Sequence, residues 1–453
     1  MLFERFVSEG IAHFSYFIGS GGEAAIIDPR RDCEVYLTCA AANGMRITGI
    51  FETHRNEDYA IGSGDLSGIC GAPVYHGAAL PFGYGIPVRE GDRFTFGDLV
   101  LSVRETPGHT DESISLVVTD SAHPGHPYIV FTGDLLFSGD TGRTDLGGYG
   151  TREAMAGAMH DSISRILPLG DGTIVCPAHG AGSVCGSAIQ DRPLTTIGFE
   201  RMTSPSLVLD RPAFVSRKNA EHHYFPPYFR TMERFNKDGW PNLSLKSPDP
   251  ITPAALKDLL KTTVQVVDIR SPTGFAAGHI PGSLSIWREG IPAFIGWFLN
   301  YDDKIVLVDD FNTGLDSILP HFIRLGYDNL TGYLAGGFIE WAKLPGETAC
   351  IGTCSVQEAV HTIQRDSLFV LDVRDIRNRD RQGHIEGSHH VYVGELPQHL
   401  AEIPKNRPVL VHCDAGYKSS IAASILVRHG VTRVTNMLGG FTAWKRAGYP
   451  VQK

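Results

Sequence analysis

The stretch YIVFTGDLLF, residues 128–137, predicts a buried strand that ends on a carboxylate, Asp134. Two earlier segments of the same kind end on histidines: ITGIFETH ends on His54, and LVLSVRETPGH ends on His109. Polar groups at the ends of strands are where α/β sheets usually build their sites. Two histidines and one carboxylate suit a mononuclear non-haem Fe(II) centre that keeps open positions for a substrate and O2. These three residues therefore predict an oxidation that uses dioxygen.

Length and composition narrow the class of protein. A chain of 453 residues is too long for one hydrophobic core, and its length predicts about three domains. Charged residues make up 20 % and the formal net charge is -10, which favours neither nucleic acid nor an acidic membrane surface as a partner. The N-terminal MLFERFVSEGIAHF has no signal-peptide pattern, and no stretch of about eighteen apolar residues occurs. We therefore expect a cytoplasmic protein whose 8 cysteines form no disulfide framework.

The first half of the chain alternates short strands with turns before it becomes helical. The segments HFSYFIG, AAIIDP and ISLVVT join those above as predicted strands. Helical spacing follows in TREAMAGAMHDSISRILPL (151–169), and TIVCPAHG (173–180) predicts another strand, with His179 near its end. Residues 190–248, rich in Arg, Pro and aromatic side chains, predict a helical extension. A Pro-bearing linker, SPDPITP (247–253), follows.

The second half repeats itself at a period of roughly a hundred residues. VQVVDIRSPTGFAAGHIPGSLSI (264–286) is matched by LFVLDVRDIRNRDRQGHIEGSHHV (368–391), and LTGYLAGGFIEWAKLPGE (330–347) is matched by VTNMLGGFTAWKRAGYPV (434–451). The patterns D-x-R, G-H-I-x-G-S and G-G-F-x-x-W recur in the same order. Two copies of one small parallel α/β domain are therefore expected.

The motif THRNEDY at 53–59 resembles the metallo-β-lactamase superfamily, whose pattern there is T-H-x-H-x-D-H. The later TPGHT, FTGD and PAHG runs follow in the expected order, and the resemblance covers roughly residues 1–240. It implies an αββα sandwich for a domain at 1–245. The chain departs from the pattern at Asn56 and Tyr59, where the superfamily has two ligands of its usual dinuclear zinc centre.

The ligands that remain, His54, His109 and Asp134, are those of the persulfide dioxygenases within this superfamily, which the resemblance implies bind one Fe(II) per chain. Loss of two ligands would damage a hydrolase that makes hydroxide between two metals. A monometallic oxygenase does not need them. The resemblance thus implies a single iron that oxidises a persulfide.

Arg143 and Asp145, in TGRTDLGG, also match the persulfide dioxygenases. The guanidinium could bind the carboxylates of a thiol carrier, or the two residues could form an ion pair that stabilises their own loop. Both readings stay open at the sequence level.

Further side chains near the predicted metal have less certain roles. His179 belongs to the second zinc site of dinuclear relatives, and here we expect it in the pocket without a bond to the metal. Asp58 is expected to orient a ligand histidine through a hydrogen bond, and Tyr59 to line the same pocket. Cys185, in AGSVCGSA, either faces this pocket or simply packs.

HCDAGYKSS, residues 412–420, follows the predicted strand PVLV and opens a helix. Loop N–H groups at a helix N-terminus form a cradle that stabilises a thiolate. With the motifs around it, this copy at 352–453 resembles rhodanese, the sulfurtransferase that carries sulfur as a cysteine persulfide. The resemblance implies that Cys413 is the carrier and that Lys418 holds an incoming sulfite or thiosulfate.

The copy at 250–347 has IVLVDDFNTG where the other has PVLVHCDAG, so Asp310 stands in the place of Cys413. A carboxylate cannot carry sulfane sulfur and would repel anionic substrates. We expect this copy to be catalytically silent and to act in packing, in an interface or in shaping a channel. Cys350 and Cys354, between the copies, are expected to be bystanders.

The order of domains resembles the CstB-like persulfide dioxygenase–rhodanese fusions over nearly the whole chain. That resemblance implies oxidation of small thiol persulfides by O2 to sulfite, followed by conversion of sulfite to thiosulfate at Cys413, as in sulfide detoxification. Proximity of the two sites would raise the effective concentration of the intermediate. The motifs leave the direction of flow and the thiol open: glutathione, coenzyme A, bacillithiol or another small thiol. We expect a homo-oligomer.

Two rival functions remain. A zinc-dependent, glyoxalase-II-like thioester hydrolase fused to a sulfurtransferase predicts two metals and no oxygen uptake. A non-oxidative sulfur-relay protein with a decayed first site predicts no tightly bound metal.

Overall fold

The computed structural model describes residues 1–146, 150–243, 247–365 and 368–453. The chain divides into two compact units, Met1–Ser244 with Ile323–Gly326, and Leu245–Phe322 with Tyr327–Lys453. The predicted domain boundary at 245 and the end of the TGRTDLGG run lie outside the described residues. Among the described helices, none combines the length and apolar character that a membrane span requires.

The first unit is built on two six-stranded sheets. The first has the order β1-β2-β3-β4-β5-β6 and the second β12-β11-β10-β9-β8-β7. The strands of the first sheet are β1 (Leu2–Ser8), β2 (His13–Ser20), β3 (Glu23–Ile27), β4 (Arg46–Phe51), β5 (Val74–Gly77) and β6 (Ile86–Val88). Those of the second are β7 (Arg93–Phe96), β8 (Leu99–Glu105), β9 (Ile114–Asp120), β10 (Ile129–Gly133), β11 (Ile174–Pro177) and β12 (Thr195–Thr196).

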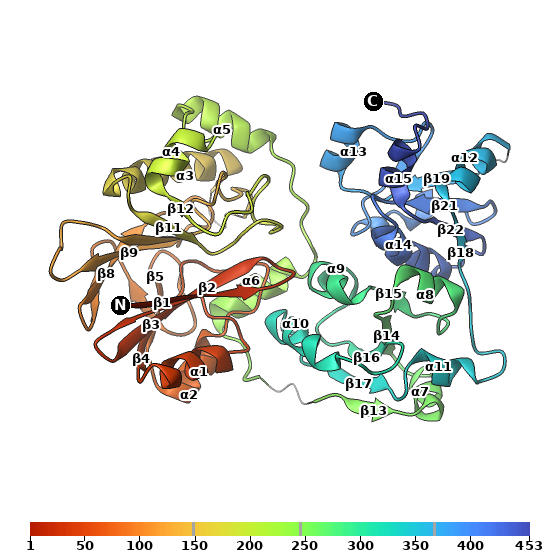
Figure 1. Ribbon diagram of the computed structural model, residues 1–453, viewed down its shortest axis with the longest axis horizontal. Helices are drawn as coiled ribbons and strands as arrows, with labels where there is room; N and C mark the ends of the chain where they lie inside the picture. The colour runs from red at the N-terminus through yellow and green to blue at the C-terminus, as the bar shows by residue number, and fades with distance from the viewer. Residues whose placement is uncertain (147–149, 244–246, 366–367) are drawn as a thin grey trace. The chain divides into compact units, whose positions relative to one another are not determined.

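Helices cover the outer faces of both sheets (Figure 1). They are α1 (Glu34–Ala42), α2 (Ser63–Cys70), α3 (Arg152–Ile166), α4 (Ile197–Thr203) and α5 (Arg211–Ala220), whereas α6 (Phe229–Asp238) lies against the loop after β4, where Asn236 donates to the carbonyl oxygens of Asn56 and Tyr59. Tyr36 and Leu66 pack α1 and α2 onto the first sheet, while Met159 and Phe214 pack α3 and α5 onto the second. A third apolar cluster, which includes Phe51 of the first sheet, fills the space between the sheets. This layering confirms the predicted αββα sandwich.

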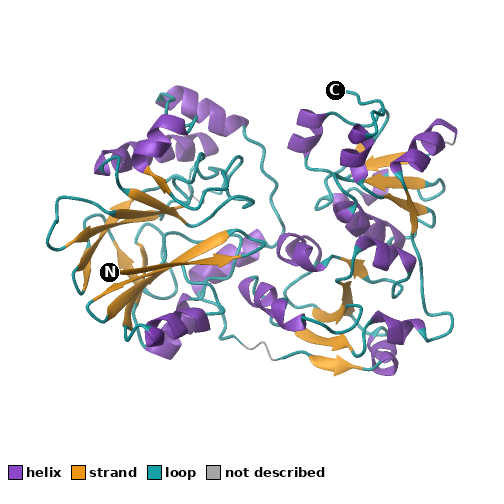
Figure 2. Ribbon diagram, in the orientation of Figure 1, coloured by secondary structure: helices purple, strands orange, loops and turns teal. Residues whose placement is uncertain are grey.

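The second unit contains two five-stranded parallel sheets of the same order, β13-β17-β16-β14-β15 and β18-β22-β21-β19-β20 (Figure 2). The strands of the first are β13 (Asp249–Ile251), β14 (Val264–Asp268), β15 (Leu284–Ser285), β16 (Lys304–Val308) and β17 (Leu330–Leu334). Those of the second are β18 (Gly352–Cys354), β19 (Phe369–Asp372), β20 (His389–His390), β21 (Val409–His412) and β22 (Val434–Met437).

Helices connect the parallel strands, as parallel pairing requires. In the first copy they are α7 (Pro253–Leu259), α8 (Pro272–Ala277), α9 (Ile291–Phe298), α10 (Leu319–Arg324) and α11 (Phe338–Ala342). In the second they are α12 (Val356–Arg365), α13 (Ile376–Gln382), α14 (Tyr417–Arg428) and α15 (Gly440–Arg446). The identical strand order confirms the prediction of two copies of one fold.

One local prediction needs correction. The SPDPITP segment was expected to be a linker, yet Asp249–Ile251 within it form β13 and pair with β17. β13 is an edge strand, and an edge position tolerates Pro250 because only one side of the strand must donate to a neighbour. Because β13 is short and contains few apolar residues, its sequence shows no strand pattern.

Candidate metal centre and sulfur site

The three predicted ligands come together at one end of the sandwich. His54 lies just beyond β4, His109 beyond β8 and Asp134 directly after β10, and all three are buried. The Oδ2 atom of Asp134 lies 3.8 Å from His54 Nε2 and 3.5 Å from His109 Nε2. Ligand atoms around an ion with bonds of about 2.1 Å are separated by roughly 3 to 3.5 Å, so a small contraction would seat a metal.

Hydrogen bonds from outside the cluster fix both imidazole rings. The Nδ1 atom of His54 lies 2.9 Å from Thr53 Oγ1, and Thr53 Oγ1 donates to Asp28 Oδ2 at 2.8 Å. His109 Nδ1 lies 2.9 Å from the carbonyl oxygen of Arg143, to which it can only donate. Each Nε2 atom is thereby turned toward Asp134. Such fixed outer contacts are typical of metal-binding histidines.

The burial of unpaired polar atoms tests whether this donor set fits a metal. The Nε2 atom of His54 has no hydrogen-bond partner among the described residues, although the side chain is buried. An unsatisfied buried nitrogen is destabilising unless something binds it. With Asp134 and His109 facing the same point, the donors fit a first-row transition metal.

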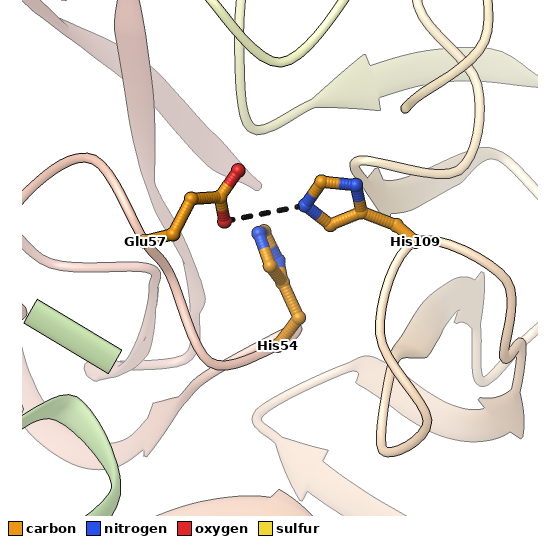
Figure 3. Close-up of side chains that lie close together, drawn as sticks. All are labelled: His54, Glu57 and His109. Atoms are coloured by element: carbon orange, nitrogen blue, oxygen red, sulfur yellow. Dashed lines mark hydrogen bonds and ion pairs between the residues drawn. The ribbon is translucent and has the colours of Figure 1, made fainter. Parts of the chain in front are cut away.

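Glu57 is a further donor that the sequence analysis missed. Its Oε2 atom lies 3.4 Å from His109 Nε2, and His54, Glu57 and His109 form one compact group of potential ligands (Figure 3). It is buried, as the histidines are. The site therefore offers two carboxylates beside its two histidines, which leaves fewer open positions than the sequence predicted.

Charge coupling in this cluster is strong. Burial lowers the pKa of His54 to about 4, although Asp134 opposes the shift. For His109, burial acts in the same direction, but Glu57 outweighs it and raises the pKa to about 9. Burial would raise the pKa of Glu57, yet His109 holds it at about 2. A proton on His109 thus balances the carboxylates here, and a metal cation could take its place.

Asp58, His179 and Cys185 form a second group of buried potential ligands. His179 Nε2 lies 3.1 Å from Asp58 Oδ2, and Cys185 Sγ lies 3.7 Å from the same oxygen. His179 Nδ1 also contacts Asp134 Oδ1 at 2.8 Å. Asp58 therefore pairs with His179 and not with His54 or His109, whose orientation was its predicted role. Cys185 does face the cluster.

Asn56 and Tyr59 occupy the places of the two absent histidines. Tyr59 is buried and its ring lies 3.8 Å from that of His13, a residue of β2, at an interplanar angle of 30°. The Asn56 amide donates to the carbonyl oxygen of His54 at 3.2 Å. Both side chains thus have packing or hydrogen-bonding roles. The sequence analysis did not identify His13 as part of this site, because it lies on β2, far from Tyr59 along the chain.

Arg143 and Asp145 form a bidentate ion pair, with Nε to Oδ1 at 2.6 Å and Nη2 to Oδ2 at 2.8 Å. Arg143 Nη1 donates to the carbonyl oxygens of Val184 and Tyr224, and the side chain is buried. Each of the three guanidinium nitrogens of Arg143 thus already donates a hydrogen bond. This geometry favours the loop-stabilising alternative over binding of a carrier carboxylate.

A cavity of about 220 Å³ reaches the cluster at His179. Aromatic rings of β1 and β2 form part of its wall, namely Phe3, Phe14 and Tyr16, and Arg5 adds a positive charge.

The sulfur site lies in the second unit, where β21 meets α14. Cys413 is 1 % exposed, and its Sγ accepts hydrogen bonds from the Gly416 N–H at 3.1 Å and the Ser419 hydroxyl at 3.4 Å. Gly416 adopts a φ of 103°, which side chains other than glycine rarely permit. The predicted cradle at the helix N-terminus is therefore present. Lys418, the predicted anion-binding residue, lies with its Nζ 3.0 Å from Asp414 Oδ2.

The predicted match of Asp310 with Cys413 is wrong by one residue. Asp268 pairs with Val308 in the register in which Asp372 pairs with His412, so buried Asp309 takes the place of Cys413. Asp310, which follows it, has a side chain that is 58 % exposed. Its nearest cationic group is Arg270, with Nη1 at 3.9 Å. Of the two cysteines between the copies, Cys350 is exposed and donates to the carbonyl oxygen of Ala277, and Cys354 is half-buried. All 8 cysteines are free.

Comparison with known proteins agrees with this architecture. The metallo-beta-lactamase superfamily matches residues 9–179, and the rhodanese-like domain matches 252–344 and 355–447. A hydroxyacylglutathione hydrolase from Maricaulis maris is 31% identical over 241 residues, which cover 47% of this chain and 88% of the relative. An uncharacterised protein from Mycobacterium tuberculosis (strain ATCC 25618 / H37Rv) is 28% identical over 214 residues, 41% of this chain and 88% of the relative.

Among solved structures, a metallo-beta-lactamase from Staphylococcus aureus subsp. aureus COL is 32% identical with a TM-score of 0.67, and the match covers 74% of this chain and 99% of that one. ETHE1 from Myxococcus xanthus is 28% identical with a TM-score of 0.46 and covers 52% of this chain and 98% of that one. The first of these matches extends well beyond the sandwich. The chain belongs to the metallo-beta-lactamase superfamily and carries two rhodanese-like domains after its metallo-beta-lactamase domain.

Proposed function

We propose that the protein is a persulfide dioxygenase of the CstB-like fusion type, which oxidises small thiol persulfides to sulfite and passes sulfite to Cys413. The overall first step is R–S–S⁻ + O2 + H2O → R–SH + SO3²⁻ + H⁺. The observation that carries this proposal is the convergence of His54 Nε2, His109 Nε2 and Asp134 Oδ2 at one buried point. When bound there, a single Fe(II) would supply the activation of O2.

The residues of the chain supply binding and orientation. Thr53 and the Arg143 carbonyl hold the two imidazoles so that their Nε2 atoms face Asp134. Glu57, with Oε2 3.4 Å from His109 Nε2, is a second carboxylate that could hold the metal beside Asp134. Burial of the whole cluster excludes bulk water from a reactive sulfur intermediate.

The second step takes place at Cys413. The thiolate first takes sulfane sulfur from a persulfide, Cys–S⁻ + R–S–SH → Cys–S–S⁻ + R–SH. Sulfite then attacks the outer sulfur, Cys–S–S⁻ + SO3²⁻ → Cys–S⁻ + S2O3²⁻, which forms one S–S bond and breaks another. The Gly416 N–H and the Ser419 hydroxyl stabilise the thiolate that leaves. Lys418 lies two residues beyond Gly416, where its charge can attract sulfite.

A second candidate function has its own supporting observation. Asp58, His179 and Cys185 offer three donor atoms within 4.8 Å of one another, next to Asp134. Such a group could hold a second ion, and two bridged metals would generate hydroxide for thioester hydrolysis. The likeness to a hydroxyacylglutathione hydrolase agrees with this alternative. The metal content separates the two functions.

The test is metal analysis of the full chain combined with oxygen uptake on glutathione persulfide. We expect one iron per chain and O2 consumption, and we expect H109A and D134A to lose both. As a matched control, His160→Ala changes a histidine on α3 outside the cluster and should leave both unchanged. Oxygen uptake that persists in H109A and D134A would refute the iron site. Two zinc ions per chain with thioester cleavage and no oxygen uptake would establish the hydrolase instead.

A further inference from the structure

A cavity remains open in the silent copy at the place where a catalytic sulfur would otherwise stand. It has a volume of about 320 Å³, which is at the lower end of the range for small-molecule sites. Asp309, Asp310 and Phe311 of the loop after β16 line one side, and Trp287 and Arg288 line another. This cavity lies outside the machinery described so far.

The cavity also borders the active copy. Tyr417, the first residue of α14, lines it, and its ring meets that of Trp287 at a centroid distance of 5.0 Å. The residue before it, Gly416, donates to Cys413 Sγ. A molecule in the cavity would therefore touch the residue next to the sulfur cradle.

Hydrogen bonds hold α14 against the silent copy, so this proximity is built into the unit. The backbone N–H of Ser285, in β15, donates to Ser424 Oγ at 3.1 Å. The hydroxyl oxygens of Ser285 and Ser420 lie 2.9 Å apart. All three side chains are buried.

An unsatisfied acceptor indicates what kind of group the cavity would bind. Asp309 is buried, and its Oδ2 has no hydrogen-bond partner among the described residues. Its other oxygen accepts from the Asn312 amide at 2.7 Å, and the nearest cation, Arg288 Nη2, is 4.0 Å from Oδ2. A ligand that donates a hydrogen bond, best an ammonium group, would satisfy this oxygen.

The opposite charge is also present. Arg270 directs Nη1 toward the cavity side of Asp310, and the guanidinium of Arg288 lies on the same lining. Arg270 already donates to Asp268 through Nε and Nη2, and Arg288 donates to the carbonyl oxygens of Thr313 and Gly314, so Arg270 Nη1 is the donor best placed to attract a carboxylate. Phe311 is 71% exposed at this cavity and offers an apolar face for the rest of a ligand. The cavity thus presents an anion, cations and an aromatic surface on one lining.

We propose that the silent copy binds the head group of the thiol that exchanges sulfur with Cys413, and that this head carries both an ammonium and a carboxylate group. The inference rests on the proposed sulfur transfer at Cys413. It gives the silent copy a role in choosing the carrier: an aminocarboxylate thiol is held at Asp309 and the arginines while its sulfur reaches past Tyr417. Thiols without such a head would react without this selection.

The test measures the rhodanese reaction of the full chain without oxygen, with thiosulfate as sulfur donor and sulfite release as the signal. The acceptors are cysteine and N-acetylcysteine, which differ in the ammonium group. In the wild type, cysteine should have the lower KM. In D309N, the KM for N-acetylcysteine divided by the KM for cysteine should fall about tenfold, while kcat stays unchanged. Because the ratio is compared between proteins, the different acidities of the two thiols cancel.

A second variant guards against a folding defect in D309N. Phe311→Ala removes an exposed side chain and should raise KM for cysteine and for glutathione a few-fold, with no change for 2-mercaptoethanol. Arg433→Ala, an exposed change in the active copy away from the cavity, is the matched control and should alter none of these values.

An unchanged ratio of the two KM values in D309N, together with normal KM values in F311A, would overturn the inference. An equal rise in KM for all the thiols would overturn it as well. Coenzyme A, which lacks the aminocarboxylate head, should bind no better than 2-mercaptoethanol; a tight response that depends on Asp309 would contradict the proposed chemistry. Thiosulfate turnover does not use the metal centre. Failure here would leave the dioxygenase untouched, whereas absence of any turnover would count against the proposed sulfur transfer.

Discussion

The two rhodanese-like copies share a framework but differ at the loop that follows the central strand. Asp268 and Arg270 pair at 2.9 Å (Nε to Oδ1) and 2.6 Å (Nη2 to Oδ2), and Asp372 and Arg374 repeat both distances. Each guanidinium carbon lies 3.8 Å from the centre of a phenylalanine ring of the G-G-F motif. The shared motifs therefore maintain the fold, and they do so equally in the copy without a sulfur.

The loops that follow the two central strands differ in where the next helix begins. Cys413 is buried and α14 starts four residues later, so the helix N-terminus closes on the sulfur. Asp309, at the equivalent position, is buried as well, but α10 begins only at Leu319, after a short 3-10 turn at Leu315–Ser317. The difference teaches that sulfur chemistry depends on the path of a few loop residues. The surrounding framework is shared by both copies and does not determine whether a copy can carry sulfur.

The largest expected effect is at the sulfur itself. Cys413→Ser should lower thiosulfate sulfurtransferase turnover by more than about a thousand-fold, because serine cannot form the persulfide. Sulfite release from thiosulfate measures it. Cys350→Ser, at the exposed cysteine between the copies, is the matched control and should retain full turnover. Residual turnover above a tenth of the wild-type rate in C413S would place the carrier elsewhere.

Restoring a thiol to the silent copy should not restore activity. In the double variant D309C with C413S we expect less than about one hundredth of the wild-type turnover, because α10 begins only at Leu319 and its N-terminus does not close on position 309. The same assay applies. Appreciable turnover would show that identity of the residue, and not the path of the loop, silences this copy.

The framework should respond in the same way in both copies. Removing the guanidinium in R270A or in R374A leaves a buried carboxylate unpaired, which destabilises a protein by about 3 to 5 kcal/mol. Calorimetry of the full chain should show a lowered unfolding transition of similar size for each. A large loss in one variant with none in the other would break the structural equivalence of the copies.

The smallest effect concerns a single donor in the cradle. Ser419→Ala removes a hydrogen bond of 3.4 Å to Cys413 Sγ, and the Gly416 N–H remains. We expect a few-fold slower alkylation of Cys413 by iodoacetamide at neutral pH, measured by mass spectrometry of the labelled peptide. Faster alkylation would mean that the hydroxyl shields the sulfur and does not activate it.

The sequence was sufficient for the architecture because the relevant signals are local. Strands that end on His54 or Asp134, and a D-x-R motif that recurs, can be recognised within a few residues. The alignment of the strands also showed that the first copy lacks a cysteine at this point, although it was one residue off: Asp309, and not Asp310, matches Cys413. Short, Pro-containing β13 escaped because its identity depends on a neighbour far along the chain, β17.

The site was harder to predict because its contacts join distant segments. Glu57 meets His109 across more than fifty residues, and His13 reaches Tyr59 from another strand. The motif marks Glu57 only as a variable position. For Arg143, the motif left ligand binding and a loop-stabilising ion pair open, and only the three-dimensional partners reveal that its donors are already engaged.

The central claim is that one site makes sulfite from a persulfide and O2 while Cys413 consumes it. The most direct measurement is the product analysis of glutathione persulfide oxidation by the wild type and by C413S under air. We predict equal O2 uptake in both, with thiosulfate from the wild type and sulfite in its place from C413S. An unchanged thiosulfate yield in C413S, or no O2 uptake by either protein, would contradict the account.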